Sequence, residues 1–270
     1  MTSPFTDLER PPLRQLALRK ALVVDGGFWT RLDVVQETGS TNADAVAAAA
    51  RGAAQGLVIA AEHQVTGKGR NARTWTAPPR SGLAVSVLLR PPPTTRAAWG
   101  WLPLLAGVAV ASAIRRHGKV EAQLKWPNDV LVDGRKLAGI LAEVAGDAVV
   151  IGMGINVSLR PAELPVPTAT SLAIAGADTT DRDTVLRAVL RELADRYRGW
   201  LAVNGDAETS GLHSAYTDLC ATLDRDVVAH LPGGGTLTGR ATAVDRSGAL
   251  VIDTVEGPAT LAAGDVVHLR

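Results

Sequence analysis

The 270-residue sequence predicts an α+β fold in which helices flank a mixed β-sheet and a small β-barrel follows at the C-terminus. Three observations support this prediction. Apolar segments of strand length and of helix length follow one another up to about residue 120, which indicates helices packed on a sheet. Between residues 122 and 151, short apolar segments are joined by Asp-Gly and Gly-Asp turns, which are typical of antiparallel hairpins. After residue 222, short strands and Gly-rich turns alternate at close spacing, as in a small barrel.

The first part of the chain is expected to alternate helices with strands. Apolar periodicity and turn residues place these elements at residues 13–22 (helix), 32–36 (strand), 43–50 (helix), 57–62 (strand), 83–89 (strand) and 97–117 (helix). The second helix follows the sequence E-T-G-S-T-N-A-D, in which Thr41 and Asp44 fit a capping box. Residues Ser40, Thr41 and Asn42 would therefore lie at a helix N-terminus, where they either cap the helix or bind a ligand.

The second part of the chain is expected to consist of hairpins, an irregular crossing, a helix and the barrel. Strands are expected at residues 122–126, 130–132, 136–144 and 148–151, the last one ending in G-M-G-I-N. Residues 158–180 are rich in proline and irregular, and Asp181 caps a helix with one apolar face. The change of character near residues 215–222 predicts two domains, residues 1–218 and residues 219–270.

Composition limits the class of protein. The formal net charge is +1, so no broad basic face is available to neutralise a run of nucleic-acid phosphates. A single cysteine, Cys220, and an N-terminus without a signal segment predict a cytoplasmic protein. The uncharged run from Ala97 to Ile114 approaches the length of a membrane span. Its proline, serine, glycine and tryptophan residues favour a buried helix instead.

The segment Glu62–Trp75, E-H-Q-V-T-G-K-G-R-N-A-R-T-W, is the clearest candidate for ligand binding. It places the cations Lys68, Arg70 and Arg73 and two glycines in one short loop directly after an apolar strand. Glycine permits a close approach of the backbone to a ligand, and Lys and Arg side chains donate hydrogen bonds to phosphate or carboxylate. Taken alone, the loop fits a solvated basic turn equally well.

A second candidate is the hairpin that begins with L-K-W-P-N-D-V. Lys125 and Lys136 flank it in an otherwise apolar stretch, where a lysine requires an anion or solvent. Other chemistries lack support. G-K-G-R is not a P-loop, G-M-G-I-N lacks the third glycine of a dinucleotide fingerprint, and there is no G-x-S-x-G elbow. The histidines do not have the spacing of metal ligands.

Five motifs in order resemble those of the biotin protein ligases. They are S-T-N, E-H-Q-x-x-G-K-G-R-x-x-R-x-W, L-K-W-P-N-D-V, G-R-K-L-A-G-I-L-A-E-V and G-M-G-I-N-V. The resemblance covers about residues 32–157, and the C-terminal G-D-V-V-H-L-R also fits. It implies the class II synthetase-like fold of biotin and lipoate ligases with a C-terminal SH3-like β-barrel, in a monofunctional form without an N-terminal DNA-binding domain.

The resemblance also implies a role for each matching residue. Biotin would be bound by Ser40, Thr41, Asn42, Gln64, Lys68, Gly69, Arg70 and Lys136. ATP would be bound by Arg73, Trp75, Lys125, Asn128 and Asn156. Catalysis would depend on Lys136, Arg70 and Asp129. No metal ligands are expected in the protein, because Mg²⁺ would be carried mainly by the nucleotide phosphates.

The basic loop departs from the family pattern G-R-G-R-x-G-R at two positions. Lys68 replaces the first arginine, which keeps the charge and loses the two-pronged geometry of a guanidinium. Ala72 replaces the last glycine and disfavours a positive φ. We therefore expect a somewhat different turn in this part of the loop.

The implied reaction activates biotin with ATP to biotinyl-5'-AMP and pyrophosphate, then transfers biotin to a lysine of a biotin carboxyl carrier domain of an acyl-CoA carboxylase. The expected protein is a monomer or weak homodimer that binds neither DNA nor membrane. The nearest alternative is a lipoate or octanoate ligase or transferase of the same fold, although Gln64 and G-K-G-R-x-x-R-x-W favour biotin. A binding module without catalysis is a further alternative.

Some biotin protein ligases carry an N-terminal winged helix that represses transcription, and only about thirty residues precede the first motif here. We therefore expect no specific shift of biotin-operon operator DNA in a gel-mobility assay, with or without biotin and ATP. Sequence-specific binding at nanomolar protein would contradict this prediction.

Overall fold

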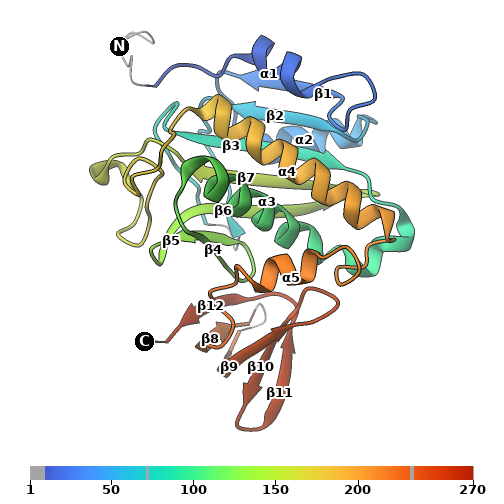
Figure 1. The fold of residues 1–270 in the computed structure, drawn as a ribbon, viewed down its shortest axis with the longest axis vertical. Coiled ribbons are helices and arrows are strands. Elements are labelled where there is room, and N and C mark those ends of the chain that lie inside the picture. The colour runs from blue at the N-terminus through green and yellow to red at the C-terminus, as the bar shows by residue number, and fades with distance from the viewer. Residues whose placement is uncertain (1–9, 71–72, 232–233, 270) are drawn as a thin grey trace.

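A seven-stranded mixed sheet forms the centre of the larger part of the molecule (Figure 1). The computed structural model describes residues 10–70, 73–231 and 234–269. The strands lie in the order β1 (Arg31–Val35), β2 (Leu57–Ala61), β3 (Gly82–Leu89), β7 (Ala148–Asn156), β6 (Arg135–Ala145), β5 (Asp129–Val132) and β4 (Ala122–Lys125). β1 and β2 are parallel and the other neighbours are antiparallel. This confirms the predicted mixed sheet.

Helices cover both faces of this sheet. Successive side chains of a strand point to opposite faces, and β2 is apolar on both. On one face, α2 (Thr41–Ala50) packs on Leu57 and Ile59 of β2. On the other face, Val58 and Ala60 belong to the main core with α3 (Trp101–Gly118) and α4 (Arg182–Ala202). The remaining helices are α1 (Gln15–Leu22), α5 (Leu212–Thr217) and the short 3₁₀ helices η2 (Pro93–Ala98) and η3 (Pro161–Glu163).

The uncharged segment near residue 100 forms a buried helix, as predicted. α3 buries most of its side chains between the sheet and α4, and both helices are seen on the near face of the sheet in Figure 1. It starts at Trp101, later than expected, because residues 93–98 form η2. Among the residues that the structure describes, no helix is long and apolar enough to cross a membrane.

Two local expectations were wrong. The helix α2 is capped by Ser40, whose side chain accepts a hydrogen bond from Ala43 N, and the supposed capping-box residue Asp44 instead accepts one from Thr38 Oγ1 at 2.6 Å. Strand β7 does not end at Ile151 and continues through G-M-G-I-N to Asn156. The glycines of this segment sit inside the strand, where they make room for side chains packed against the sheet.

The C-terminal strands form a separate antiparallel sheet, which confirms the predicted small β-domain. Its order is β11 (Gly257–Leu261), β10 (Leu250–Thr254), β9 (Thr236–Val244), β8 (Asp226–His230) and β12 (Asp265–His268). The described strands do not close into a barrel, because β11 and β12 lie at opposite ends of the sheet. The predicted boundary at residue 218 falls between α5 and β8. Two tryptophans link the parts: Trp101 donates to Arg246 O and Trp126 donates to Gly248 O.

A buried ion pair lies where β2 ends and the basic loop begins. Glu62 and Arg182 are both 5% exposed, and their charged atoms are 2.7 Å apart. Glu62 also accepts a hydrogen bond from Leu13 N at 2.6 Å, and Arg182 donates to Pro11 O at 2.6 Å. The pair therefore joins the N-terminal segment, the end of β2 and the start of α4.

Removal of one member of this pair should be costly. Arg182→Ala leaves the Glu62 carboxylate buried without its counter-charge, which should lower the free energy of unfolding by about 3–5 kcal/mol. The matched control is Arg116→Ala, because Arg116 is 67% exposed in its ion pair with Glu192 and should contribute less than about 1 kcal/mol. Urea denaturation measures both values, and equal losses would contradict the prediction.

Candidate active site

All of the predicted site residues line one cavity of about 830 Å³. They come from segments far apart in the chain: residues 40–42, 64–75, 125–136 and Asn156. The cavity lies at the end of the sheet where β2 leads into the basic loop and where β5 and β6 form a hairpin. The fold therefore brings together every residue that the motifs selected.

Polar groups at the start of α2 form one end of the cavity. Gln64 Oε1 accepts a hydrogen bond from Thr41 N at 2.8 Å and lies 3.0 Å from Thr41 Oγ1. The segments that carry these residues run parallel, since Thr38 and Gln64 form a β-bridge that prolongs the pairing of β1 with β2. Ser40, Thr41 and Asn42 are all buried. The residues thus form a fixed hydrogen-bonding surface as well as a helix cap.

The floor of the cavity is the glycine-containing part of β7. A Cβ atom on Gly152 would lie 2.2 Å from Asn42 Oδ1, and one on Gly154 would lie 2.4 Å from the Trp75 ring. Both distances are shorter than atoms can approach without bonding. Glycine at these two positions therefore lets Asn42 and Trp75 rest directly on the sheet.

The basic loop folds back on itself beside this floor. Gly69 N donates to Arg73 O at 2.7 Å, and Trp75 N donates to Gly67 O at 2.8 Å. Ala72, where we expected an altered turn, lies outside the described residues. The side chain of Lys68 is exposed, whereas that of Arg70 is half-buried and donates to Asn128 Oδ1 at 3.2 Å.

Burial lowers the pKa of the Arg70 guanidinium below its usual value, and the nearby carboxylates of Asp265 and Asp129 oppose this effect. An arginine stays protonated even so, because its ordinary pKa is far above neutrality. Arg70 is therefore a partly desolvated cation inside the cavity wall.

The Lys136 ammonium lies 2.7 Å from Asp129 Oδ1 and 5.8 Å from the centre of the Trp75 ring. Asp129 and Lys136 belong to neighbouring strands, so the ion pair bridges the β5–β6 hairpin. The main chain of Lys136 is held from the other side, where Thr168 O accepts from Lys136 N and Lys136 O accepts from Thr170 N, both at 2.8 Å. The main chain of Lys136 is therefore fixed by the neighbouring segment, and its ammonium is held by Asp129.

The two predicted asparagines are tied to the backbone around the cavity. Asn128 Nδ2 donates to Ile140 O at 3.1 Å, while its Oδ1 accepts from Arg70. Asn156 Nδ2 donates to Thr170 O at 2.9 Å. Asn128 thus connects the hairpin to the basic loop, and Asn156 connects the end of β7 to the segment that holds Lys136.

The C-terminal sheet contributes residues that the motifs did not predict. Asp265, Val267 and His268 of β12 line the cavity, and Asp265 forms an ion pair with Arg73 of the basic loop. Burial lowers the pKa of His268 below its usual value and the charge of Lys125 lowers it further, which favours a neutral imidazole at pH 7. The C-terminal motif G-D-V-V-H contained these residues, but nothing in the sequence placed them beside the loop.

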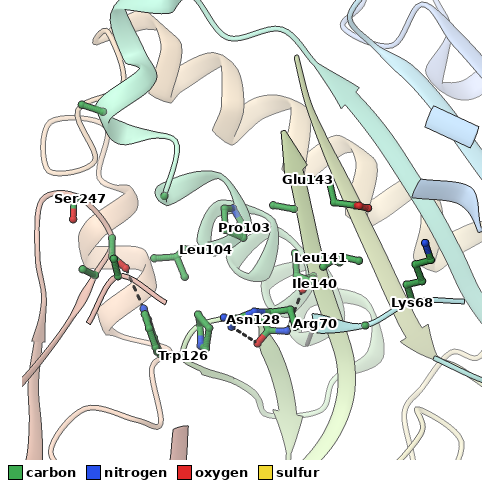
Figure 2. A pocket seen from close by; sticks show the side chains of 18 residues that line it. Lys68, Arg70, Pro103, Leu104, Trp126, Asn128, Ile140, Leu141, Glu143 and Ser247 are labelled. Atoms are coloured by element: carbon green, nitrogen blue, oxygen red, sulfur yellow. Dashed lines mark hydrogen bonds between the residues drawn. The ribbon is translucent and has the colours of Figure 1, made fainter. Parts of the chain in front are cut away.

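A second cavity of about 610 Å³ lies on the other side of the basic loop. It shares Lys68, Gly69, Arg70 and Asn128 with the first cavity. Figure 2 shows Trp126 and Ser247 on one side of this space and Lys68 and Glu143 on the other. The loop and the Arg70–Asn128 hydrogen bond therefore form a wall between the two cavities.

Comparisons with known proteins agree on one family. The sequence pattern of the Biotin/lipoate A/B protein ligase family matches residues 38–157, and that of the Biotin protein ligase C terminal domain matches residues 222–269. The chain is 44% identical over 268 residues to a biotin–(acetyl-CoA-carboxylase) ligase of Mycobacterium tuberculosis, with 98% of each chain covered. It is 32% identical over 236 residues to a bifunctional ligase/repressor of Bacillus subtilis, covering 84% of this chain and 70% of that protein.

Solved structures agree with the sequence relatives. A biotin protein ligase from Aquifex aeolicus in complex with biotin and ATP superposes with a TM-score of 0.74 at 28% identity, covering 90% of this chain and all of the other. The same protein without ligands superposes with a TM-score of 0.73 at 26% identity.

The glycine floor can be tested directly. Gly152→Ala should lower the free energy of unfolding by about 1–3 kcal/mol, because the added methyl group overpacks Asn42, which its own hydrogen bonds hold in place. The control Gly199→Ala adds a methyl group to α4 where no atom lies within 4 Å, and it should leave stability unchanged or raised. Chemical denaturation measures both, and an unchanged Gly152→Ala protein would argue against the close packing.

Proposed function

The chain belongs to the biotin protein ligase family, and we propose that the cavity lined by the predicted site residues carries out both half-reactions of that family. Biotin reacts with ATP to give biotinyl-5'-AMP and pyrophosphate, and the biotinyl group then passes to a lysine amine. One observation carries the proposal: all of the residues that family motifs select line a single cavity. A lipoate or octanoate enzyme is disfavoured, because the biotin-specific C-terminal domain pattern matches residues 222–269.

The first half-reaction must hold two anions together, the biotin carboxylate and the α-phosphate of ATP. Two unit charges of like sign at about 4 Å repel by about 4 kcal/mol at an effective dielectric near 20. Lys136 of the hairpin and Arg70 of the basic loop both line the cavity. We assign Lys136 to the carboxylate and α-phosphate and Arg70 to phosphate oxygens, which offsets this repulsion before the carboxylate oxygen attacks phosphorus.

The polar end of the cavity suits the ring system of biotin. Thr41, Asn42 and Gln64 offer hydroxyl and amide groups that match the donors and acceptor of a urea. Ser40 holds the start of α2 by capping it. Gly69 and Lys68 of the basic loop would cover the bound biotin from the other side.

The nucleotide would occupy the rest of the cavity, beside Arg73, Trp75, Lys125, Asn128 and Asn156. Arg73 can exchange its ion pair with Asp265 for a phosphate. Among the described residues, no group of three or more His, Cys, Asp or Glu side chains could hold a metal. Mg²⁺ would be coordinated mainly by the nucleotide phosphates and by water, as is usual for this ion. There it would neutralise the departing pyrophosphate.

In the second half-reaction a neutral lysine amine attacks the carbonyl carbon of the mixed anhydride. The C–N bond forms, the bond from that carbon to the phosphate oxygen breaks, AMP leaves and the nitrogen loses a proton. Asp129, released from Lys136 once phosphate is bound, would balance charge at this stage. We propose a carrier domain of an acyl-CoA carboxylase as the acceptor, in the cytoplasm, with the ligase a monomer or weak homodimer that does not bind DNA.

The assignment of Lys136 is tested by biotin-dependent exchange of labelled pyrophosphate into ATP. Lys136→Ala should reduce the exchange rate by roughly 100-fold or more, since removal of one group that stabilises transition-state charge has this effect in other enzymes. Lys20→Ala changes an exposed lysine of α1 and should retain full activity. Full exchange activity in Lys136→Ala would contradict the role assigned to Lys136. Exchange that depends on octanoate and not on biotin would show that the substrate is a fatty acid.

A further inference from the structure

A chain of hydrogen-bonding side chains leads from the polar end of the cavity to the carboxylate of Glu143. This residue was not among the predicted site residues. Asn42 Nδ2 donates to Glu143 Oε2 at 2.6 Å, and Asn42 Oδ1 lies 2.6 Å from Ser86 Oγ. Ser86 Oγ lies 2.7 Å from Thr41 Oγ1, which lies 3.0 Å from Gln64 Oε1. Ser86, on β3, is completely buried.

The carboxylate fixes which way the Asn42 amide points. A carboxylate only accepts hydrogen bonds, and so does the backbone oxygen of Leu141, which lies 3.3 Å from Asn42 Nδ2. With the amide reversed, Asn42 Oδ1 would face two acceptors. The side-chain nitrogen must therefore point toward Glu143, and the side-chain oxygen toward Ser86.

The direction of the remaining hydrogen bonds follows from counting protons. Three oxygen–oxygen contacts join Asn42, Ser86, Thr41 and Gln64, but the two hydroxyl groups supply only two protons. The contact left without a proton is the longest one, Thr41 Oγ1 to Gln64 Oε1 at 3.0 Å, because unprotonated oxygens repel each other more strongly at shorter distance. Thr41 then donates to Ser86, Ser86 donates to Asn42, and Asn42 donates to Glu143.

We propose that Glu143 and Ser86 are positioning residues of the biotin pocket. They orient this chain of hydrogen bonds so that every donor points toward Glu143. Thr41 Oγ1 and Gln64 Oε1 are then two adjacent acceptors for an N–H group of the biotin urea. The inference rests on the proposed function, because it concerns how that same pocket recognises the ring. Glu143 reaches the pocket from β6, and its side chain also lines the second cavity (Figure 2).

A carboxamide in place of the carboxylate should release this constraint. In Glu143→Gln, the new side chain can donate as well as accept, so the Asn42 amide and the hydroxyls can reverse. We expect the KM for biotin in pyrophosphate exchange to rise about tenfold, as for loss of a hydrogen bond to a charged group, with kcat changed less than about twofold. Ser86→Ala, which interrupts this chain of hydrogen bonds at its buried centre, should give the same KM-specific effect. The control is Asp147→Asn, on the exposed turn between β6 and β7, which should change neither constant.

A double-mutant cycle separates positioning through Asn42 from a general structural effect. In an Asn42→Ala background, Glu143→Gln should no longer change the KM for biotin. An unchanged KM in both Glu143→Gln and Ser86→Ala, or an equal effect with and without Asn42, would overturn the inference. If Glu143→Gln does not fold, the Ser86→Ala result decides. Absence of biotin-dependent exchange in the unmodified protein would instead refute the proposed function.

Discussion

The ion pair between Lys136 and Asp129 is the contact on which the site depends. A lysine in the wall of a cavity that is to receive two anions needs a counter-charge before they arrive, because a partly buried ammonium without a partner is costly. Asp129 supplies it at 2.7 Å across the β5–β6 hairpin. The same hairpin carries Asn128, which accepts a hydrogen bond from Arg70. One supersecondary element therefore places both the cation of the sheet and the cation of the basic loop.

The sheet itself is shaped to let side chains approach its backbone. A strand of a central sheet usually presents side chains on both faces, but β7 has glycines at positions 152 and 154 on the face that meets α2. Asn42 rests on the first and Trp75 on the second. Asn42 of the helix N-terminus and the Trp75 ring of the basic loop thus both lie directly on β7. The cavity that they line also contains Lys136.

Much of the architecture followed from local signals in the sequence, and the residues selected by the motifs line one cavity, as the resemblance implied. Apolar runs located the strands, and Lys125, Lys136 and the glycine-rich basic loop marked positions where an apolar segment carries unexplained charge. What could not be predicted depends on contacts between distant segments. Ser86 looks like any small residue in a buried strand, and only the packing of β3 against α2 brings it to Asn42. The expected strand at residues 148–151 was too short, because glycine weakens a strand unless a neighbouring side chain needs the space.

The C-terminal sheet shows the same dependence on distant contacts and explains how charge is distributed in the site. Lys136 has Asp129 as its counter-charge, and Arg73 has Asp265 of β12. Arg70, by contrast, has the neutral Asn128 oxygen as its partner, and no ion pair to it occurs among the residues described in the structure. Burial lowers the pKa of its guanidinium, and the charges of Asp265 and Asp129 only partly oppose this effect. A phosphate that approaches Arg70 displaces no carboxylate, whereas at Lys136 and Arg73 it must compete with one. We therefore expect Arg70 to gain more from an incoming phosphate than Lys136 or Arg73.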